Sequence, residues 1–173
     1  MKEYLDVVDE NDKVIGKADW DEVRSKNLLH RGTAVFIFNS KKELFVHKRS
    51  KTMKKFPSEY AMVVGGGVSA GESYEDNAER ELYEETGIKG VKLNFLFKTF
   101  FNGNGAKSFI KVYSCLYDGD IKLQEEEIEE GFFVSLNEIN KIITQKKFTE
   151  VSLQIFDEYM KKYHKNDPAI KGL

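Results

Sequence analysis

Three glutamates in one short segment have the spacing of a metal site. Glu81, Glu84 and Glu85 stand at i, i+3 and i+4, so their carboxylates project from one side of the helix predicted there. Like charges at this spacing repel by about 0.2–0.5 kcal/mol per pair, and the last turn of a helix favours cations. A divalent cation removes both costs, and clustered carboxylate oxygens suit Mg²⁺, with Mn²⁺ as a substitute. The alternative is an exposed charged helix without a ligand.

A run of three glycines, Gly65 to Gly67, precedes this helix and follows an apolar stretch. Glycine permits positive φ and close backbone approach, and such a turn leaves carbonyl and N–H groups free to face a ligand. A glycine run alone is more often a tight turn. Coupled to a carboxylate helix at fixed spacing, it indicates a binding loop.

Together the loop and the helix resemble the box of the Nudix hydrolases, G-x5-E-x7-R-E-U-x-E-E-x-G-U, where U is apolar. Every box position matches, and they read Gly66, Glu72, Arg80, Glu81, Leu82, Glu84, Glu85, Gly87 and Ile88. The resemblance implies the Nudix fold, an α/β/α sandwich with a central mixed sheet. It also implies Mg²⁺-dependent hydrolysis of a diphosphate linkage in a nucleoside diphosphate derivative or nucleotide, with water attacking phosphorus.

The resemblance also implies roles for single residues. The metal ligands would be Glu81, Glu84, Glu85 and the carbonyl of Gly66, with Glu84, Glu85 and Arg80 as catalytic residues. Arg80 would orient the carboxylates through ion pairs, Glu72 would hold the loop against the helix, and Gly87 would end the helix. The general base in this family is often a glutamate of the box or of a later loop, and we expect Glu127 from the acidic run 125–130. A solvated acidic loop is the alternative.

Two cations at the end of the strand predicted over 43–48 are candidates for binding substrate. Arg49 suits a phosphate because its guanidinium fork matches phosphoryl oxygens, and Lys48 lies beside it on the opposite strand face. They belong to a basic strip, 41–55, that directly precedes the acidic box. Structural ion pairing is the alternative for Arg49. Aromatic residues at 100, 101, 109 and 113 could stack on a base or fill the core, while Trp20 and Cys115 give no functional signal.

Residues 6–50 are also similar to the N-terminal part of isopentenyl-diphosphate isomerases and their Nudix relatives. Those isomerases carry a catalytic cysteine and then a metal-binding histidine after the strand that matches 60–64, and this chain has neither. Only His30 resembles one ligand of the isomerase site. An isomerase-like enzyme and a non-catalytic nucleotide-binding module therefore remain as alternatives, although such a module is expected to have lost Glu84 or Glu85.

The pattern of strands and helices that must position these residues predicts one α/β layered domain. We expect an N-terminal hairpin and helix extension over 1–29 packed on the main domain, a Nudix hydrolase domain over 30–165 and a tail over 166–173. Strands are predicted at 3–8, 13–18, 33–38, 43–48, 60–64, 91–101, 108–117 and 131–135, and helices at 19–27, 73–86, 136–145 and 149–164. The N-terminal hairpin is a candidate element for a homodimer.

Composition excludes several other classes. One cysteine in 173 residues excludes an internal disulfide and a multi-cysteine zinc site. A net charge of −2 gives no general attraction to nucleic acid or to anionic membranes. The N-terminus lacks the apolar core of a secretory signal, and no stretch approaches the roughly 18 apolar residues of a membrane span. We therefore expect a cytoplasmic enzyme whose partner is a small-molecule diphosphate.

Overall fold

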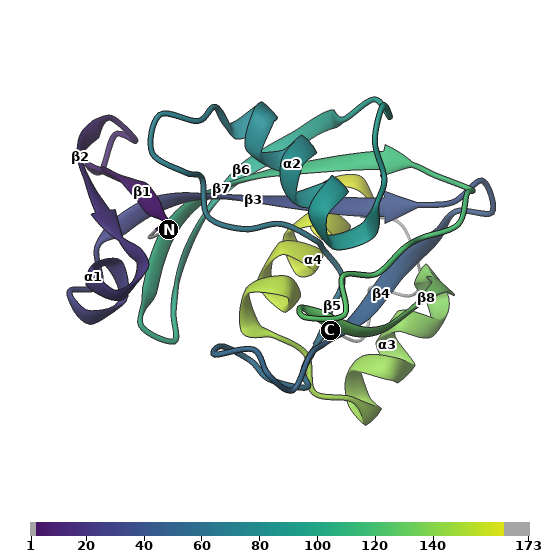
Figure 1. The fold of residues 1–173 in the computed structure, drawn as a ribbon. Coiled ribbons are helices and arrows are strands. Elements are labelled where there is room, and N and C mark those ends of the chain that lie inside the picture. Colours follow the sequence, from purple (N-terminus) through teal and green to yellow (C-terminus); the bar gives the residue numbers. More distant parts are fainter. Residues whose placement is uncertain (1–2, 165–173) are drawn as a thin grey trace.

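Strand β3 (Leu29–Phe38) lies at the centre of the sheet in the computed structural model, which describes residues 3–164. It pairs in parallel with β7 (Ala106–Leu116) along its whole length, and β6 (Asn94–Gly103) pairs antiparallel with β7 (Figure 1). Strand β1 (Tyr4–Val8) contacts the start of β3 and forms a hairpin with β2 (Val14–Asp19). The sheet therefore mixes parallel and antiparallel pairs.

A second set of strands diverges from this half of the sheet. Strand β4 (Glu43–Arg49) pairs antiparallel with β8 (Ile128–Ser135) and with the short β5 (Tyr60–Ala61). Between β3 and β4 the register contains one pair, Phe38 with Leu44, at the hairpin that joins them. The two strands separate beyond this hairpin, so the segment with the glycine run can lie between the two halves of the sheet.

Helices cover both faces of β3, because successive residues of a strand point to opposite sides. Val35 and Ile37 pack in one core with Ala78 and Leu82 of α2 (Tyr74–Thr86). Ala34 and Phe36 pack in the other core with residues of α4 (Glu150–Tyr163), and α3 (Leu136–Gln145) contributes Ile139 to the same core. This confirms the predicted α/β/α sandwich with a central mixed sheet.

Helix α2 begins and ends where the sequence predicts. The Ser73 side chain accepts a hydrogen bond from the Asp76 N–H, which caps the first turn. Gly87 follows the last turn with φ of 71°, in the left-handed region, and its N–H donates to the Tyr83 carbonyl. These local signals fix the length and phase of the helix that carries the box glutamates.

The strand predicted over 60–64 is interrupted. Tyr60 and Ala61 pair with β4, whereas Val64 forms an isolated bridge with Val35 of β3. The chain crosses from one half of the sheet to the other at residues 62 and 63, so no continuous strand forms. Strands β3 and β8 also begin earlier than predicted, at Leu29 and Ile128, and buried Ile128 draws the end of the acidic run into the sheet.

The N-terminal segment packs on the glycine loop and on β3. The hairpin and α1 (Trp20–Ser25) bury Leu5, Ala18 and Val23 in a small third core. The Ala70 N–H donates to the Tyr4 carbonyl at 2.7 Å. The predicted tail at 166–173 lies outside the described residues. Over residues 3–164, no helix has the length and apolar character needed to cross a membrane.

Asp12, in the turn of this hairpin, joins the N-terminal segment to three other elements. Its carboxylate accepts hydrogen bonds from Arg31 Nε at 2.7 Å, Lys98 Nζ at 2.5 Å and the Tyr74 hydroxyl at 3.0 Å. Burial alone would raise the pKa of the Asp12 carboxyl, but hydrogen bonds from Arg31, Lys98 and Tyr74 outweigh it and hold the pKa below its ordinary value.

Asp12→Ala should lower the free energy of unfolding by about 2 kcal/mol at pH 7, because it removes the acceptor of buried Tyr74, partly buried Arg31 and exposed Lys98. A carboxyl with a depressed folded-state pKa stabilises the fold above its unfolded pKa and loses that effect as pH falls. The difference between wild type and variant in urea denaturation should therefore shrink below about pH 4. The exposed Asp120→Ala serves as control, and an equal loss in both variants would contradict this role.

Candidate active site

Arg80 of α2 binds several of the glutamates that the sequence places in the site. Its Nη1 lies 2.8 Å from Glu84 Oε2 and 3.0 Å from Glu81 Oε1. Its Nε and Nη2 donate to the two carboxylate oxygens of Glu72, at 2.9 and 3.1 Å. This fork-to-fork pairing is the strong geometry for a guanidinium and a carboxylate. One cation is therefore shared among three carboxylates.

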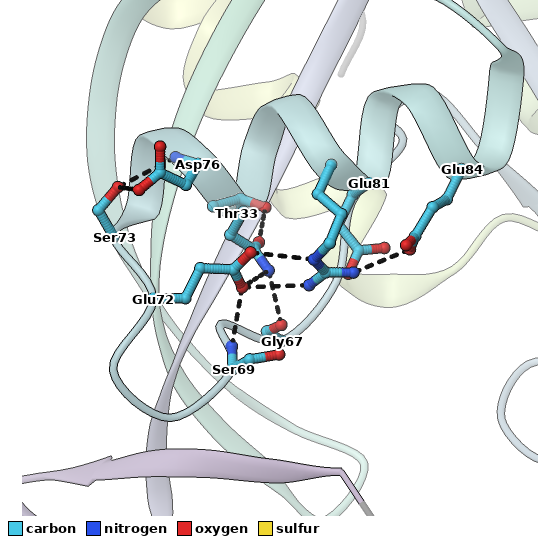
Figure 2. A network of polar contacts seen from close by, with 10 residues as sticks. Thr33, Gly67, Ser69, Glu72, Ser73, Asp76, Glu81 and Glu84 are labelled. Carbon is cyan, nitrogen blue, oxygen red and sulfur yellow. Dashed lines mark hydrogen bonds and ion pairs between the residues drawn. The ribbon is translucent and has the colours of Figure 1, made fainter. Parts of the chain in front are cut away.

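Glu72 connects the glycine loop to the helix (Figure 2). Its Oε2 accepts a hydrogen bond from the Ser69 N–H at 3.1 Å and one from the Asn77 amide at 3.0 Å. Burial by itself would raise the pKa of Glu72, but hydrogen bonds from Arg80 and Asn77 outweigh it and lower the pKa. Glu72 thus stays anionic at neutral pH and connects the loop, Asn77 and Arg80.

Asn77 is a fully buried residue of this network that sequence reasoning misses. Its Nδ2 donates to the Gly67 carbonyl at 2.9 Å, and its Oδ1 accepts from the Thr33 hydroxyl at 2.5 Å. It therefore holds the glycine loop against both α2 and β3. The only signal in the sequence is a polar residue beside Ala78 on the face of the helix that packs in the core.

The surroundings of Glu85 and Glu81 disfavour the ionised form of both carboxyl groups. Glu85 is 4% exposed and accepts one hydrogen bond, from the Gly65 N–H at 2.7 Å. Burial, and then the charge of Glu81, raise the pKa of Glu85 well above its ordinary value. Burial likewise raises the pKa of Glu81 to about 7, and Glu84 and Glu127 add to the rise. Nearby positive charge would stabilise both anions.

Gly66 lies directly against Glu81. A β-carbon built at Gly66 would come within 2.7 Å of Glu81 Oε1, so a larger residue would displace the carboxylate. The Gly66 carbonyl accepts a hydrogen bond from the Thr33 N–H at 2.9 Å. A carbonyl oxygen has two lone pairs, so one remains for another partner.

The donor set of the site fits a hard divalent cation, since it consists of carboxylate and carbonyl oxygens. The sequence predicts that Glu81, Glu84 and Glu85 converge, and the structure differs. Between residues 3 and 164, no three Asp, Glu, His or Cys side chains are grouped as metal ligands. Arg80 contacts Glu81 and Glu84, whereas Glu85 accepts a hydrogen bond from the Gly65 N–H, so the three carboxylates do not share one partner.

A cavity of about 660 Å³ opens beside Glu81, the one of these three carboxylates that lines it. Glu81 and Glu127 lie in its wall, as do Arg49 and the glycine run. The charge of Glu127 contributes to the raised pKa values of Glu81 and Glu85, whereas Arg49 lowers that of Glu85. The structure therefore brings these four side chains, from three separate segments, into electrostatic reach of one another.

Lys48 does not line this cavity. Its Nζ lies 3.0 Å from Glu129 Oε1 on the neighbouring strand, which fits the alternation that separates it from Arg49. Of the four aromatic residues considered for stacking, only Phe101 reaches the cavity wall. Cys115 is buried in the core between the sheet and α2 and also lies outside that wall.

The remaining cavity wall includes Trp20 and Arg24 of α1, to which the sequence assigns no role. It also includes Lys54 and Lys55 of the basic strip, and His30 of β3. The His30 Nδ1 lies 3.1 Å from the Leu28 carbonyl oxygen, and its ring stands edge-on to Trp20 at 5.6 Å. These residues meet only through the tertiary fold, since they are far apart along the chain.

Comparisons with known proteins point to one family. The family model of the NUDIX domain matches residues 28–158. The Nudix hydrolase YfcD of Escherichia coli is 30% identical over 95% of this chain and 91% of its own. The Nudix hydrolase PA4841 of Pseudomonas aeruginosa is 38% identical over 76% of this chain and 78% of its own.

Solved structures show the same fold. The crystal structure of DR0079 from Deinococcus radiodurans superposes with a TM-score of 0.72 at 25% identity, over 88% of this chain and 97% of that one. The NUDIX domain of NrtR from Shewanella oneidensis, solved in complex with ADP ribose, gives a TM-score of 0.61 at 16% identity, over 78% and 86%. From the matched domain and these relatives, this chain belongs to the Nudix hydrolase family.

Proposed function

We propose that the protein hydrolyses a diphosphate linkage in a nucleoside diphosphate derivative or nucleotide, with Mg²⁺ as cofactor and Mn²⁺ as a substitute. The observation that carries this proposal is the crowding of Glu81 and Glu85 beside a cavity that also contains Arg49. Buried carboxylates of raised pKa suit a cation, and an unpaired guanidinium suits a phosphate.

Glu81, Glu84, Glu85 and the Gly66 carbonyl would hold the metal. When bound, the metal would neutralise charge on the phosphoryl oxygens and lower the pKa of a water molecule. Arg80 is the positioning residue for these carboxylates, because it contacts both Glu81 and Glu84. Glu72 in turn fixes Arg80 and the glycine loop, so the contacts of this pair set where the metal ligands lie.

Glu127 is the proposed general base and would accept a proton from the attacking water at its carboxylate. Its backbone is fixed, since its carbonyl accepts from the Ser50 N–H at 2.7 Å and its N–H donates to the Gln124 carbonyl at 2.9 Å. Arg49 would bind a phosphate of the substrate. Its Nε donates to the neutral Lys55 carbonyl at 3.3 Å. Within residues 3–164 Arg49 forms no ion pair, so its positive charge is available to a phosphate.

Two alternatives lack support from the site. An isomerase-like reaction needs a group such as a thiol to transfer protons to carbon, and Cys115 lies in the core, outside the cavity wall. A module that only binds nucleotides has no need of buried carboxylates next to the phosphate-binding cations. The NrtR domain solved with ADP ribose supports the substrate class, because it shows that this fold accommodates a nucleoside diphosphate derivative.

Glu84→Gln should lower kcat at least about a hundredfold in assays with Mg²⁺, because it removes one metal-binding charge. Hydrolysis by the wild type should stop when EDTA removes the metal and return with Mg²⁺ or Mn²⁺. Glu79→Gln, an exposed change on the same helix, is the matched control and should leave kcat within about twofold. Equal turnover of the two variants would remove Glu84 from the set of metal ligands.

Arg49→Ala should raise KM about tenfold or more and change kcat less, if Arg49 binds the substrate equally in the ground and transition states. Lys48→Ala removes the adjacent charge on the opposite strand face and should leave both constants nearly unchanged. Steady-state kinetics on ADP-ribose, together with thermal unfolding of each variant, would check this. A fall in stability without a kinetic change would instead show a structural role for Arg49.

A further inference from the structure

The cavity extends around the glycine loop to a second region, away from the box glutamates. A β-carbon built at Gly66 would meet Glu81, whereas one built at Gly67 would lie 2.5 Å from Trp20 Cζ2. Because consecutive residues of an extended chain face opposite sides, Glu81 and Trp20 lie on opposite sides of the loop. Both line the same cavity.

The N-terminal segment builds one wall of this second region. Trp20 and Arg24 belong to α1, which precedes the residues matched by the family model, 28–158. The Arg24 guanidinium lies over the Trp20 ring, with 4.9 Å between Cζ and the ring centroid. This stacking fixes the guanidinium at the cavity wall and leaves its N–H groups free to donate.

Arg24 lacks an anionic partner. Its Nε is buried and has no hydrogen-bond acceptor, and within residues 3–164 neither Arg24 nor Lys55 forms an ion pair. A buried donor without an acceptor destabilises the fold. The fold therefore keeps a guanidinium with an unsatisfied Nε donor at the cavity wall.

Lys55, from the loop after β4, lines the same cavity as Arg24. Burial, and then the charge of Arg24, lower the pKa of Lys55. Burial also lowers the pKa of His30, and the charges of Lys55 and Arg24 add to that effect. The charges of Arg24 and Lys55 are thus close enough to repel each other beside His30, and a bound anion would relieve this repulsion.

Three carboxylates near α1 also line the cavity, but among the described residues none of them forms an ion pair with Arg24 or Lys55. Glu3 accepts a hydrogen bond from Trp20 Nε1 at 2.9 Å, and Asp19 caps α1 by accepting from the Glu22 N–H at 2.9 Å. Asp21 is exposed and forms no ion pair with Arg24, although it stands three residues before it. None of the three acidic groups neutralises the pair of cations.

We propose that Arg24 and Lys55 form a subsite for a terminal phosphate dianion carried by the substrate, on the opposite side of the glycine loop from the box glutamates. The substrate class then narrows to diphosphates with one further phosphate group. This role in substrate choice rests on the proposed hydrolase function, whereas anion binding at the subsite does not. Two sources share the chemistry: a phosphate on a ribose hydroxyl, and the terminal phosphate of a nucleoside triphosphate.

Anion binding can be measured without turnover, because Trp20 is the single tryptophan of the chain and lies against Arg24. Metal-free protein would be titrated with inorganic phosphate at constant ionic strength while Trp20 fluorescence is recorded. Arg24→Gln and Lys55→Gln each remove one charge of the subsite. Lys26→Gln is the matched control, since Lys26 follows α1 but pairs with Glu22 at 2.7 Å and lies outside the cavity wall.

We expect a saturable fluorescence change whose apparent Kd rises about tenfold or more in Arg24→Gln and Lys55→Gln. In Lys26→Gln it should rise less than about twofold. No saturable change, or equal affinity in all four proteins, would overturn the subsite even if the enzyme hydrolyses diphosphates. Conversely, Arg24-dependent binding without any hydrolysis would retain the subsite and contradict the proposed function.

Kinetics with matched substrates identify the source of the phosphate. ADP-ribose would be compared with its 2′-phosphate, and ADP with ATP, in wild type and in Arg24→Gln. At least one phosphorylated member should show about tenfold higher kcat/KM, and Arg24→Gln should abolish that preference mainly through KM. The pair that shows the effect identifies the source. Equal preferences in wild type and Arg24→Gln for both pairs would refute the role in substrate choice.

Discussion

The site depends on one constraint, which is that acidic side chains lie against a glycine loop with too little positive charge nearby. Arg80 is shared among Glu72, Glu81 and Glu84, while buried Glu85 has a single N–H donor from the loop. Position 66 requires glycine because Glu81 occupies the space that a β-carbon would need. A fold selected for stability alone would place an apolar or basic residue at position 85.

This arrangement determines how the rest of the fold is used. Asn77 and Glu72 hold the loop at a fixed distance from α2, and the loop in turn fills the gap where β3 and β4 separate. The N-terminal hairpin and α1 then pack against the outer side of the loop, through Trp20 at Gly67. One loop therefore has the box glutamates on one side and the cationic wall of α1 on the other.

The sequence predicts the parts of this site that are set by local rules. Ser73 and Gly87 mark the ends of α2 because capping depends on a few neighbouring residues, and helical spacing places the glutamates in register. Strand alternation likewise separates Arg49 from Lys48. The family resemblance adds the layered fold, which a periodic pattern alone does not identify.

Features that depend on tertiary contacts are not predictable in this way. The strand expected over 60–64 is interrupted because the chain crosses between two halves of the sheet. An apolar pattern does not indicate which strand will be the pairing partner. Trp20, Arg24 and Lys55 meet only when the N-terminal segment packs on the domain. Helical spacing places the three glutamates on α2, but it does not reveal that Arg80 contacts two of them while the Gly65 N–H donates to Glu85.

The central claim is that the crowded carboxylates hold a divalent cation, and Mn²⁺ binding followed by electron paramagnetic resonance tests it most directly. Free Mn²⁺ gives a strong signal that disappears on binding, so affinity can be measured without a substrate. The account predicts saturable binding that competes with Mg²⁺ and weakens at least about tenfold in Glu85→Gln, since one anionic ligand is lost. Absence of saturable binding, or equal affinity in Glu85→Gln, would contradict it.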